Sequence, residues 1–465
     1  MEVIGILLSL FLLMFFAYRG FSVILFAPVF ALLAASMSGL SLMPAYTELF
    51  MAKAVTYVKS FFPVFMLGAV FGKVMEDTGL AKGIAHSIIK GLGKERAILA
   101  VVLSASVLTY GGVSLFVVVF AVYPFAAALF READIPKRLL PGTIALGAFT
   151  ATMDSFPGTP QIQNLIPTNF FGTNGYAAPI CGLLGGIAIY IVGMWYMEKQ
   201  RKAAAAAGEG YGAHTLNEPE VSKNEGSLPS WHIAMLPLLT VLVVNFIMTR
   251  FSWDPNMLQP FLAMKLPLTA AAVKNVVSIW ALIIALVCGI LLAIALGFSR
   301  LPQGGLAKAL NAGAIGSLLA IMNTASEVGY GNVIASLSGF KAISGALLGI
   351  KVGGSPLVSE AVSVTTLAGI TGSASGGMSI ALDLMAKDWL AWSNQIGMSP
   401  EILHRVASMA SGGMDTLPHN GAVITLLAVC GLTHRDSYRD IFAITCIKTA
   451  MVFAVIIFHS ITGIL

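Results

Sequence analysis

Long apolar stretches follow one another along this chain, separated by short polar segments. Most are long enough to cross a bilayer as a helix, which takes about 20 residues. A polar segment divides them into two sets with the same order and similar lengths. We therefore predict an all-α polytopic membrane protein with a first repeat at 1–197, a linker at 198–230 and a second repeat at 231–465. The apolar stretches cover residues 2–17, 21–38, 60–76, 97–130, 137–172, 176–197, 231–251, 275–299, 303–325, 355–393, 400–433 and 438–464.

Two of these stretches are interrupted by glycine and serine where a spanning helix would continue. The run at 97–109 has 13 residues, which is about 20 Å of helix, whereas the hydrocarbon layer is about 30 Å thick. A Tyr-Gly-Gly-Val-Ser segment at 110–114 and an apolar run at 115–130 follow it. We predict two re-entrant hairpins with tips inside the membrane; the alternative is one long kinked helix in each place. The second hairpin repeats the arrangement with segments at 356–371, 372–379 and 380–392.

The stretch after each hairpin is interrupted by a carboxylate, a hydroxyl and a proline. The first break begins at Asp154 and continues Ser-Phe-Pro; the second begins at Asp415 and continues Thr-Leu-Pro. Proline blocks a helix, and a charge in apolar surroundings costs several kcal/mol. That cost, incurred at matching places in both halves, indicates a substrate site. We predict helices at 140–153, 161–171, 402–414 and 421–432, interrupted at 154–160 and 415–420.

The composition limits the class of protein. Of the 465 residues, 57% are hydrophobic and 11% are charged, against about 25% charged in soluble proteins. The net charge is +5 without a long basic run, so we expect no nucleic acid as partner. The four cysteines lie in apolar segments without ligand spacing. We therefore predict no disulfide framework, no metal site and no cofactor.

The basic residues test the hairpins independently, because loops rich in Lys and Arg face the cytoplasm. If both hairpins return to the side they entered from, each half crosses five times and the second half is inverted, which gives about 10 full spans plus two hairpins. Sixteen Lys and Arg, including those of a loop at 82–96, then share one side, and nine share the other. Counting either hairpin as one span removes this bias. We predict that the basic side is the cytoplasm and that both termini lie outside.

These features together resemble a known group of transporters. Two inverted halves, each with a hairpin tip followed by a broken helix, resemble the ion transporter superfamily. Within it, the segments 110–112, 153–161 and 412–421 are similar to those of the gluconate permease family of gluconate and proton symporters. The resemblance implies secondary uptake of a small hydroxylated organic acid such as gluconate, glycerate, hydroxybutyrate or D-serine. It also implies coupling to protons rather than sodium, a place in the lipid bilayer of the inner membrane, and a homodimer.

The expected cargo is an anion, and a half-helix that begins inside the membrane offers backbone N–H groups and the positive end of its dipole. Neither tip and neither break contains Lys or Arg, so we assign carboxylate recognition to backbone donors and hydroxyls. Polar side chains of the breaks would bind the hydroxyl groups of the cargo. The predicted substrate-binding residues are Tyr110, Gly111, Gly112, Ser114, Ser155, Thr159, Gln161, Ser373, Ser375, Gly376, Gly377, Ser379, Thr416 and Asn420.

Ionisable residues at membrane depth are candidates for proton coupling. Asp154, Asp415 and His419 lie in the breaks, and Glu327 lies in the span before the second hairpin. We predict that these four residues carry the coupling. The alternative is that either aspartate caps the helix that resumes after it, and that the histidine bonds a carbonyl.

Other polar residues at membrane depth have weaker assignments. Asn323 and Thr324 are second-line candidates near Glu327. Asp77 in the first half precedes a glycine by two positions as Glu327 does, and both could simply face water. Glu360 and Asp383 lie in the arms of the second hairpin, have no counterpart in the first half and receive no predicted role.

The sequence lacks the motifs of other classes of protein. The phosphate loop of an ATP-driven pump, Gly-x-x-x-x-Gly-Lys-Ser/Thr, does not occur. His-Glu-x-x-His is also absent, and Gly-x-Ser-x-Gly does not occur between a strand and a helix. We therefore predict a carrier that works by alternating access and not an enzyme, with an anion channel or an intramembrane enzyme as the alternative classes.

Overall fold

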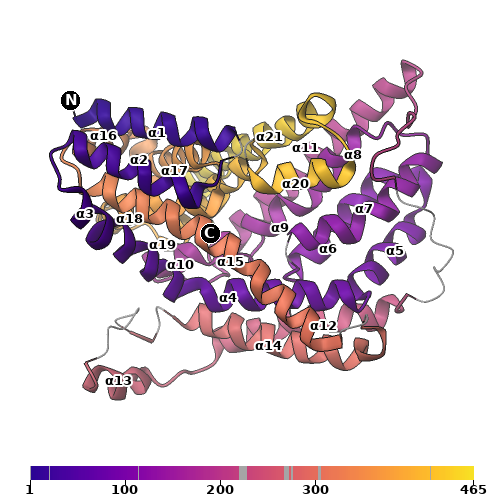
Figure 1. Cartoon of the computed structure of the whole chain (residues 1–465), viewed down its shortest axis with the longest axis horizontal. Coiled ribbons are helices and arrows are strands. Elements are labelled where there is room, and N and C mark those ends of the chain that lie inside the picture. Colours follow the sequence, from indigo (N-terminus) through magenta and orange to yellow (C-terminus); the bar gives the residue numbers. More distant parts are fainter. Residues whose placement is uncertain are drawn as a thin grey trace.

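The computed structural model describes residues 2–19, 21–113, 115–218, 228–265, 272–273, 276–301, 305–418 and 420–465. Every regular element in these ranges is helical (Figure 1). The first half comprises α1 (Glu2–Tyr18), α2 (Val23–Met37), α3 (Leu42–Pro44), the π-helical η1 (Ala45–Met51), α4 (Ala52–Asp77), α5 (Leu80–Leu92), α6 (Ala97–Tyr110), α7 (Leu115–Glu132), α8 (Leu139–Ala148), α9 (Ala151–Asp154), α10 (Ile166–Phe171) and α11 (Pro179–Ala206).

The second half repeats this order of elements after the linker. Its helices are α12 (Trp231–Arg250), α13 (Gln259–Ala263), α14 (Val277–Gly297), α15 (Gly305–Ser336), α16 (Phe340–Leu348), α17 (Leu357–Thr371), α18 (Ala374–Gln395), α19 (Pro400–Gly412), the short 3-10 turn η9 (Gly413–Thr416), α20 (Gly421–Cys430) and α21 (His434–Thr462).

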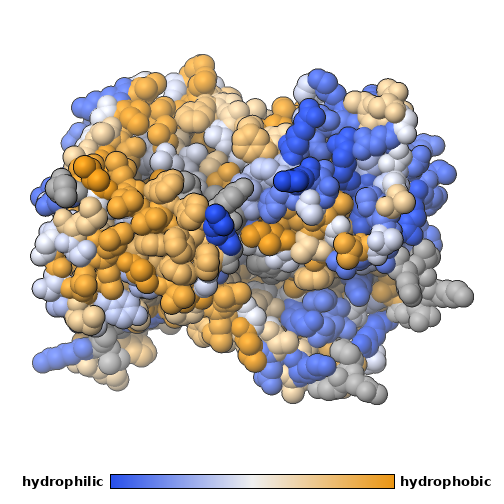
Figure 2. Space-filling model, turned by 45° about the horizontal axis from the view of Figure 1, so that its top comes forward, coloured by the Kyte–Doolittle hydropathy of each residue, from blue (hydrophilic) through white to orange (hydrophobic). Residues whose placement is uncertain are grey.

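The outer surface suits a bilayer. Within the described residues, six helical stretches are long and apolar enough to cross one, and α1 and α2 are apolar but shorter. Large apolar side chains such as Phe11 of α1 and Leu25 of α2 are exposed, at 55% and 61%. Figure 2 shows apolar residues covering much of one face. Burying this surface in lipid is favourable, so the molecule is embedded in a membrane. The six stretches are Leu42–Asp77, Pro179–Ala206, Trp231–Arg250, Val277–Arg300, Gly305–Ser336 and His434–Thr462.

Two equivalent long helices, α4 and α15, pack along each other through the middle of the molecule (Figure 1). Their backbones come close because Gly313 faces α4: a Cβ there would lie 2.6 Å from the Cα of Val70. Both helices are longer than the apolar stretches predicted, since α4 already begins at Ala52 and α15 continues to Ser336. The polar residues that ended those stretches, including Lys53 and Glu327, lie inside the helices.

Both predicted hairpins are present. Arms α6 and α7 pack against each other, as do α17 and α18. Gly112 and Gly372, in the two tips, have left-handed φ values of 92° and 70°, which glycine adopts without steric cost. The second tip is shorter than predicted, because Ser373 caps α18 by accepting a hydrogen bond from the Gly376 amide. The later residues of the predicted tip, through Ser379, therefore lie in the first turns of α18.

Both predicted broken spans are also present. The first break is longer than predicted: α8 already ends at Ala148, only the short α9 and the 3-10 turn η3 (Ile162–Asn164) follow, and α10 begins at Ile166 rather than at 161. In the second half, the turn η9 separates α19 from α20. Each break contains the predicted aspartate, Asp154 at the end of α9 and Asp415 within η9. The prolines that follow explain why neither helix continues.

The loops meet at two opposite ends of the molecule. At one end, Arg138 after α7 forms ion pairs with Glu209 after α11 and Asp440 of α21, at 2.7 Å and 3.4 Å. At the other, the Ala178 amide before α11 donates to Glu401 of α19 at 3.1 Å. We call these the linker end and the far end. This grouping agrees with two inverted halves.

The hairpins enter from these opposite ends. The first follows α5, whose Gly83 lies against the linker residue Pro229. The second follows α16, and Gly339 just before α16 lies against Glu2 at the far end. The sequence placed residues 82–96 in a loop, which is wrong, because α5 occupies most of this segment. Its apolar face packs on both arms of the first hairpin, and this tertiary contact stabilises the short helix.

Candidate functional site

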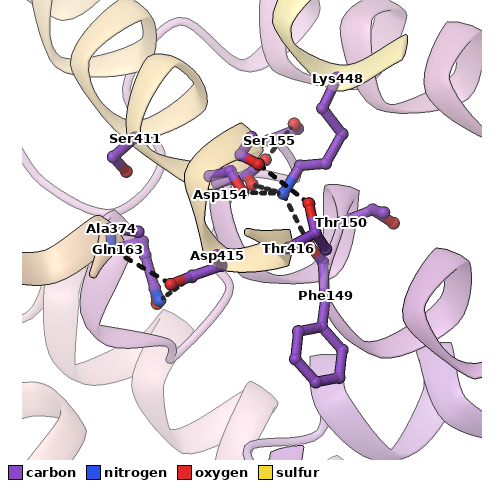
Figure 3. A network of polar contacts seen from close by, with 12 residues as sticks. Phe149, Thr150, Asp154, Ser155, Gln163, Ala374, Ser411, Asp415, Thr416 and Lys448 are labelled. Atoms are coloured by element: carbon purple, nitrogen blue, oxygen red, sulfur yellow. Dashed lines mark hydrogen bonds and ion pairs between the residues drawn. The ribbon is translucent and has the colours of Figure 1, made fainter. Parts of the chain in front are cut away.

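The two breaks meet inside the molecule around a buried lysine. Lys448, from α21, places its Nζ 2.9 Å from Oδ2 of Asp154, and both side chains are 1% exposed. The Ser155 hydroxyl donates to the other oxygen of this carboxylate at 2.6 Å. Figure 3 shows the ammonium group lying between the aspartate and the Phe149 backbone. The charge of Asp154 is thus balanced inside the protein.

Lys448 also joins the ends of two helices. Its ammonium donates to the carbonyls of Phe149, just after α8, and Gly412, the last residue of α19, each at 2.5 Å. Carbonyls at a helix C-terminus lack intrahelical partners and carry the negative end of the dipole. One cation therefore stabilises both interrupted spans at the point where they stop.

A second buried cation ties α19 to the first break. Arg405 donates to the carbonyls of Ala177 and Asp154, at 2.8 Å and 2.9 Å, and to the Asn164 amide oxygen at 3.1 Å. The neighbouring His404 bonds Thr173 at 2.6 Å. These contacts join the two broken spans into one packed unit.

Asp415 has a different environment. Its carboxylate accepts hydrogen bonds from the Gln163 amide at 2.9 Å and the Ala374 backbone amide at 3.1 Å (Figure 3). It also accepts one from the Asn420 side chain at 3.3 Å. Ala374 is the first residue of α18, so the carboxylate lies at the positive end of that helix. Among the described residues no Lys, Arg or His forms an ion pair with it.

Glu327 of α15 faces the same hairpin. It is 3% exposed, and its Oε2 has no hydrogen-bond partner within the described part of the chain. This oxygen lies so close to Gly376 that a Cβ there would overlap it. Tyr57 of α4 lies beside the carboxylate, and its own hydroxyl is also without a partner among these residues. Unsatisfied buried polar atoms of this kind are rare and indicate a functional constraint or a missing ligand.

A cavity of about 350 Å³ connects these groups. Both Asp415 and Glu327 line it, and residues near the start of α2 and in α20 place it toward the linker end. A second cavity of about 200 Å³ lies at the first tip and shares Gln163 with it. No Lys, Arg or His is among the described residues that line either one. Other polar side chains in the larger cavity are Gln163, Asn323, Thr324, Thr371, Ser373, Ser375 and Asn420.

The sequence model of the GntP family permeases matches residues 1–383. This chain belongs to the GntP permease family. An uncharacterized transporter, YxjC of Bacillus subtilis, is 54% identical over the full length of both proteins. An uncharacterized transporter of Haemophilus influenzae is 36% identical over 75 residues, 16% of the chain.

Two solved transporters share the fold of this GntP permease. The YdaH transporter of Alcanivorax borkumensis aligns with a TM-score of 0.54 and 14% identity, covering 88% of this chain and 87% of that one. MtrF of Neisseria gonorrhoeae aligns with a TM-score of 0.53 and 12% identity, covering 91% and 86%. The predicted family and the predicted membrane fold are thus confirmed, and the permease is a transporter.

The structure separates most of the predicted site residues of the permease into two groups. One group lines the cavities: Gly112, Gln161, Glu327, Ser373, Ser375, Asp415 and Asn420, with the second-line candidates Asn323 and Thr324. The other group bonds within the protein. Tyr110 donates to the Pro157 carbonyl, Thr159 to the Thr152 carbonyl, and Thr416 shares a hydrogen bond with Thr445. Ser155 bonds Asp154.

The remaining predicted residues differ in their surroundings. Gly111 packs against Leu238, and Gly377 packs against the backbone of Ala368. Their lack of a side chain permits close packing, and neither lines a cavity described above. Ser379 lines a separate cavity on the other side of Tyr57. His419 and Ser114 lie outside the described residues, so their assignments stay predictions.

Sequence reasoning missed four residues of the site: Gln163, Tyr57, Lys448 and Arg405. Gln163 carried a signal, since it lies in a Gln-Ile-Gln segment directly after the first break. A lysine and an arginine inside apolar spans are signals as well. Tyr57 carried none, because an aromatic residue in an apolar helix is ordinary. Within the described residues no three His, Cys, Asp or Glu side chains gather as a metal site would require.

Proposed function

We propose that this permease takes up a small hydroxylated organic acid together with a proton. The observation that carries the proposal is the cavity at the second hairpin, which contains two carboxylates, Glu327 and Asp415, and no described cation. Two carboxylates that line one cavity repel each other when both are ionised, and an anion that enters adds to this repulsion. An anion would therefore enter this cavity together with a proton on one of the carboxylates.

Asp415 supplies a physical reason for coupling. Its ionised carboxylate accepts a hydrogen bond from the Ala374 amide, at the helix N-terminus predicted to bind the cargo. Cargo and ionised aspartate thus compete for one donor. Protonation of Asp415 weakens the hydrogen bond that it accepts from the Ala374 amide. The carboxylate of the cargo can then accept this hydrogen bond in place of Asp415. Because such coupling is reciprocal, bound anion in turn favours the protonated aspartate.

The polar residues around this point suit hydroxyl groups. Thr324 and Ser375 lie 3.5 Å apart between their oxygens, and Asn420 reaches the Gly372 carbonyl with its amide. A site that pairs hydroxyls rejects analogues without them, because its own polar groups would stay unpaired. The cavity volume of about 350 Å³ falls within the range of small-molecule sites, about 300 to 1,000 Å³.

Transport would require alternating access. The joined breaks and both hairpins would move relative to the paired helices α4 and α15, as in other transporters built from repeats. The placement in an inner membrane with both termini outside, and assembly as a homodimer, belong to the same proposal.

The test is uptake by the purified permease in proteoliposomes. A panel of labelled C3 to C6 acids, including glycerate, 3-hydroxybutyrate, D-serine and D-gluconate, is offered under an imposed pH gradient or an imposed sodium gradient. We expect the pH gradient alone to drive accumulation of a hydroxylated member, with the unhydroxylated acid of equal length excluded. Labelled cargo inside should also exchange with unlabelled cargo outside, as in a carrier. Accumulation driven only by sodium, or passage without exchange, would overturn the proposal.

A further inference from the structure

Two buried polar atoms without partners lie side by side at the second tip. They are the Tyr57 hydroxyl of α4 and Oε2 of Glu327 of α15, and neither has a hydrogen-bond partner within the described part of the chain. The two side chains are 5% and 3% exposed. Leaving such groups unpaired is costly, and native proteins accept this cost mainly where it serves a function. The proposed function uses Glu327 but gives the tyrosine no role.

Tyr57 also lines a third cavity, of about 280 Å³, which we call the far-end cavity. Residues of α4, α10, α14 and α18 form its walls. It lies toward the far end, where α4 begins beside the last turns of α15. Two of its residues, Lys53 and Asp383, form an ion pair at 2.9 Å and are 35% and 20% exposed. Solvent therefore reaches this cavity, and its volume suffices for several water molecules of about 30 Å³ each.

The far-end cavity borders the cavity of about 350 Å³ that contains Glu327, which we call the tip cavity. Along α15, Glu327 lines the tip cavity and the next residue, Val328, lines the far-end cavity. Along α18, Ser375 lines the tip cavity and Ser379, one turn later, lines the far-end cavity. The same helices thus form walls of both. Tyr57 connects the two, since it lines the far-end cavity and lies beside Glu327.

A tyrosine hydroxyl can pass on a proton without a net change in its own charge, because it both accepts and donates hydrogen bonds. A hydronium ion in the far-end cavity gives a proton to the Tyr57 oxygen and becomes water. The original O–H bond of the tyrosine breaks as its proton moves to Oε2 of Glu327. The carboxylate becomes a carboxylic acid, the tyrosine ends neutral, and no electron is transferred.

Ser379 supplies a second hydroxyl at the same point. It lies near the Tyr57 hydroxyl and lines the far-end cavity. Its own proton is donated to the Ser375 carbonyl at 2.7 Å, and its oxygen can accept a proton from water. Ser379 lies on an arm of the second hairpin, whereas Tyr57 and Glu327 lie on the paired helices α4 and α15.

We propose that Tyr57 is the entry point of the coupled proton, which moves from the far-end cavity through the hydroxyls of Tyr57 and Ser379 to Glu327. The inference rests on the proposed proton coupling and adds its route. The charge bias of the loops assigns the far end to the outside, from which an inward pH gradient supplies protons. Because the hairpin with Ser379 would move during transport, the relay is complete in only part of the cycle, and proton leakage is limited.

Two other roles would fit the position of Tyr57. Its hydroxyl could bind the cargo, or its ring could merely pack between two helices. Other ionisable side chains surround the route, and all of them stay unchanged in the variants below. They are Lys53, Lys59 and Asp383 in the far-end cavity and Asp415 in the tip cavity.

The experiment compares two rates in proteoliposomes, with the panel acid that the wild type accumulates best. One is net uptake driven by a pH gradient, which needs a proton to enter. The other is exchange of internal for external cargo at equal pH, which needs no net movement of protons. We expect Tyr57→Phe to lower the maximal rate of net uptake about ten-fold and to leave the rate and KM of exchange unchanged. Net uptake by the wild type should also be slower in D2O than in H2O, while exchange is not.

The matched control is Tyr330→Phe, at another buried tyrosine of α15 that lines neither cavity. Its hydroxyl lies 2.9 Å from that of Ser9, so this variant should lower the unfolding temperature and keep the wild-type ratio of net uptake to exchange. Tyr57→Phe should keep the unfolding temperature, because the hydroxyl that it removes has no hydrogen-bond partner among the described residues.

Ser379→Ala is the second variant and decides the matter if Tyr57→Phe folds poorly. We expect it to lower net uptake about three-fold without changing exchange. An unchanged ratio of net uptake to exchange in the folded variants would overturn the route while leaving proton coupling intact. A KM that rises equally in both assays would overturn it in favour of a cargo contact. A wild type without uptake driven by a pH gradient would refute the proposed function, and the route with it.

Discussion

The two halves of this permease carry the same motif and use it differently. Asp154 and Asp415 are each followed by a hydroxyl residue and a proline, and each lies where a span is broken. Asp154 is neutralised by Lys448, whereas Asp415 is held by neutral donors and lines the cavity of the second hairpin. Equivalence in sequence therefore does not imply an equivalent environment, because Lys448 of α21 forms an ion pair with Asp154 and none, among the described residues, with Asp415.

The comparison suggests a division of labour. A carboxylate with a buried counterion stays ionised and holds structure, while one without a cation can gain and lose a proton during transport. We accordingly assign the first motif a mainly structural role, and we assign coupling to Asp415 with Glu327.

The largest effect is expected from Lys448→Met. This change leaves the Asp154 carboxylate buried without its cation and two helix-end carbonyls without a donor, which should lower stability by about 3–5 kcal/mol. Thermal unfolding of the purified protein in detergent measures the loss. The double variant Lys448→Met with Asp154→Leu should recover most of it, since an apolar pair replaces a buried ion pair at little cost. A stable single variant would contradict a structural role for the pair.

Substitutions at two glycines test Asp154 and Glu327 separately, because each glycine lies against one of these carboxylates. In Gly412→Ala the new Cβ would overlap Oδ2 of Asp154, which Lys448 holds in place, so we expect a stability loss of about 2–3 kcal/mol. In Gly376→Ala it would overlap Oε2 of Glu327. Among the described residues this oxygen has no hydrogen-bond partner, and Glu327 lines a cavity, so stability should fall by less than about 1 kcal/mol while uptake falls strongly.

The control for both is Gly345→Ala in α16, where a Cβ would meet no atom within 4 Å. It should be neutral or slightly stabilising, because alanine favours a helix. Unfolding temperature and uptake are measured on all three variants. Equal losses of stability in Gly412→Ala and Gly376→Ala would remove the distinction between the two carboxylates.

The aspartates themselves should differ in function. We expect Asp415→Asn to lower uptake driven by a pH gradient about 10- to 100-fold while exchange of internal for external cargo continues, because the amide cannot carry the proton. Asp154→Asn should instead lower the unfolding temperature and leave the remaining folded protein coupled. Uptake driven by a pH gradient and exchange of cargo are measured for both variants in proteoliposomes that contain equal amounts of folded protein. If Asp154→Asn lost coupling and Asp415→Asn lost stability instead, coupling would belong to Asp154 and the structural role to Asp415.

The smallest effect is expected at the linker end, where ion pairs meet water. Burial alone would raise the pKa of Glu218, but hydrogen bonds and charges from Lys137 and Arg131 hold this pKa below its usual range. A lowered pKa stabilises the fold above the unfolded value, about 4.3, and this contribution is lost as the pH falls through the folded value. Glu218→Gln should therefore cost about 1 kcal/mol at pH 7 and less at pH 4.

The control is Glu209→Gln, at a more exposed carboxylate whose pKa is lowered by its hydrogen bond to Arg138. Its loss of stability should be smaller than that of Glu218→Gln, because Lys137 is fully buried, lies 2.6 Å from the Glu218 carboxylate and forms no other ion pair among the described residues. Unfolding temperatures at pH 7 and pH 4 measure the loss of stability in both variants. A loss of stability in Glu218→Gln that is as large at pH 4 as at pH 7 would contradict the ion-pair explanation.

Local signals were sufficient for much of the architecture. Glycines placed in the middle of apolar runs marked both hairpin tips, and prolines after each aspartate marked both breaks, because these residues disturb a helix whatever surrounds them. Prediction was less accurate where tertiary contacts override local preference. The helix α5 and the long ends of α4 and α15 are stabilised by packing and by partners such as Asp383 for Lys53.

The chain alone thus determined the membrane class, the two repeats, the hairpins, the breaks and which residues could carry charge at membrane depth, since all of these follow from local chemistry and periodicity. Only the tertiary structure decided which charges are paired. Lys448 reaches Asp154 from a helix almost 300 residues later, Gln163 of the first half reaches Asp415 of the second, and Glu327 stays without a partner in the described residues. The electrostatic state of a buried group depends on neighbours in space, which no local pattern contains.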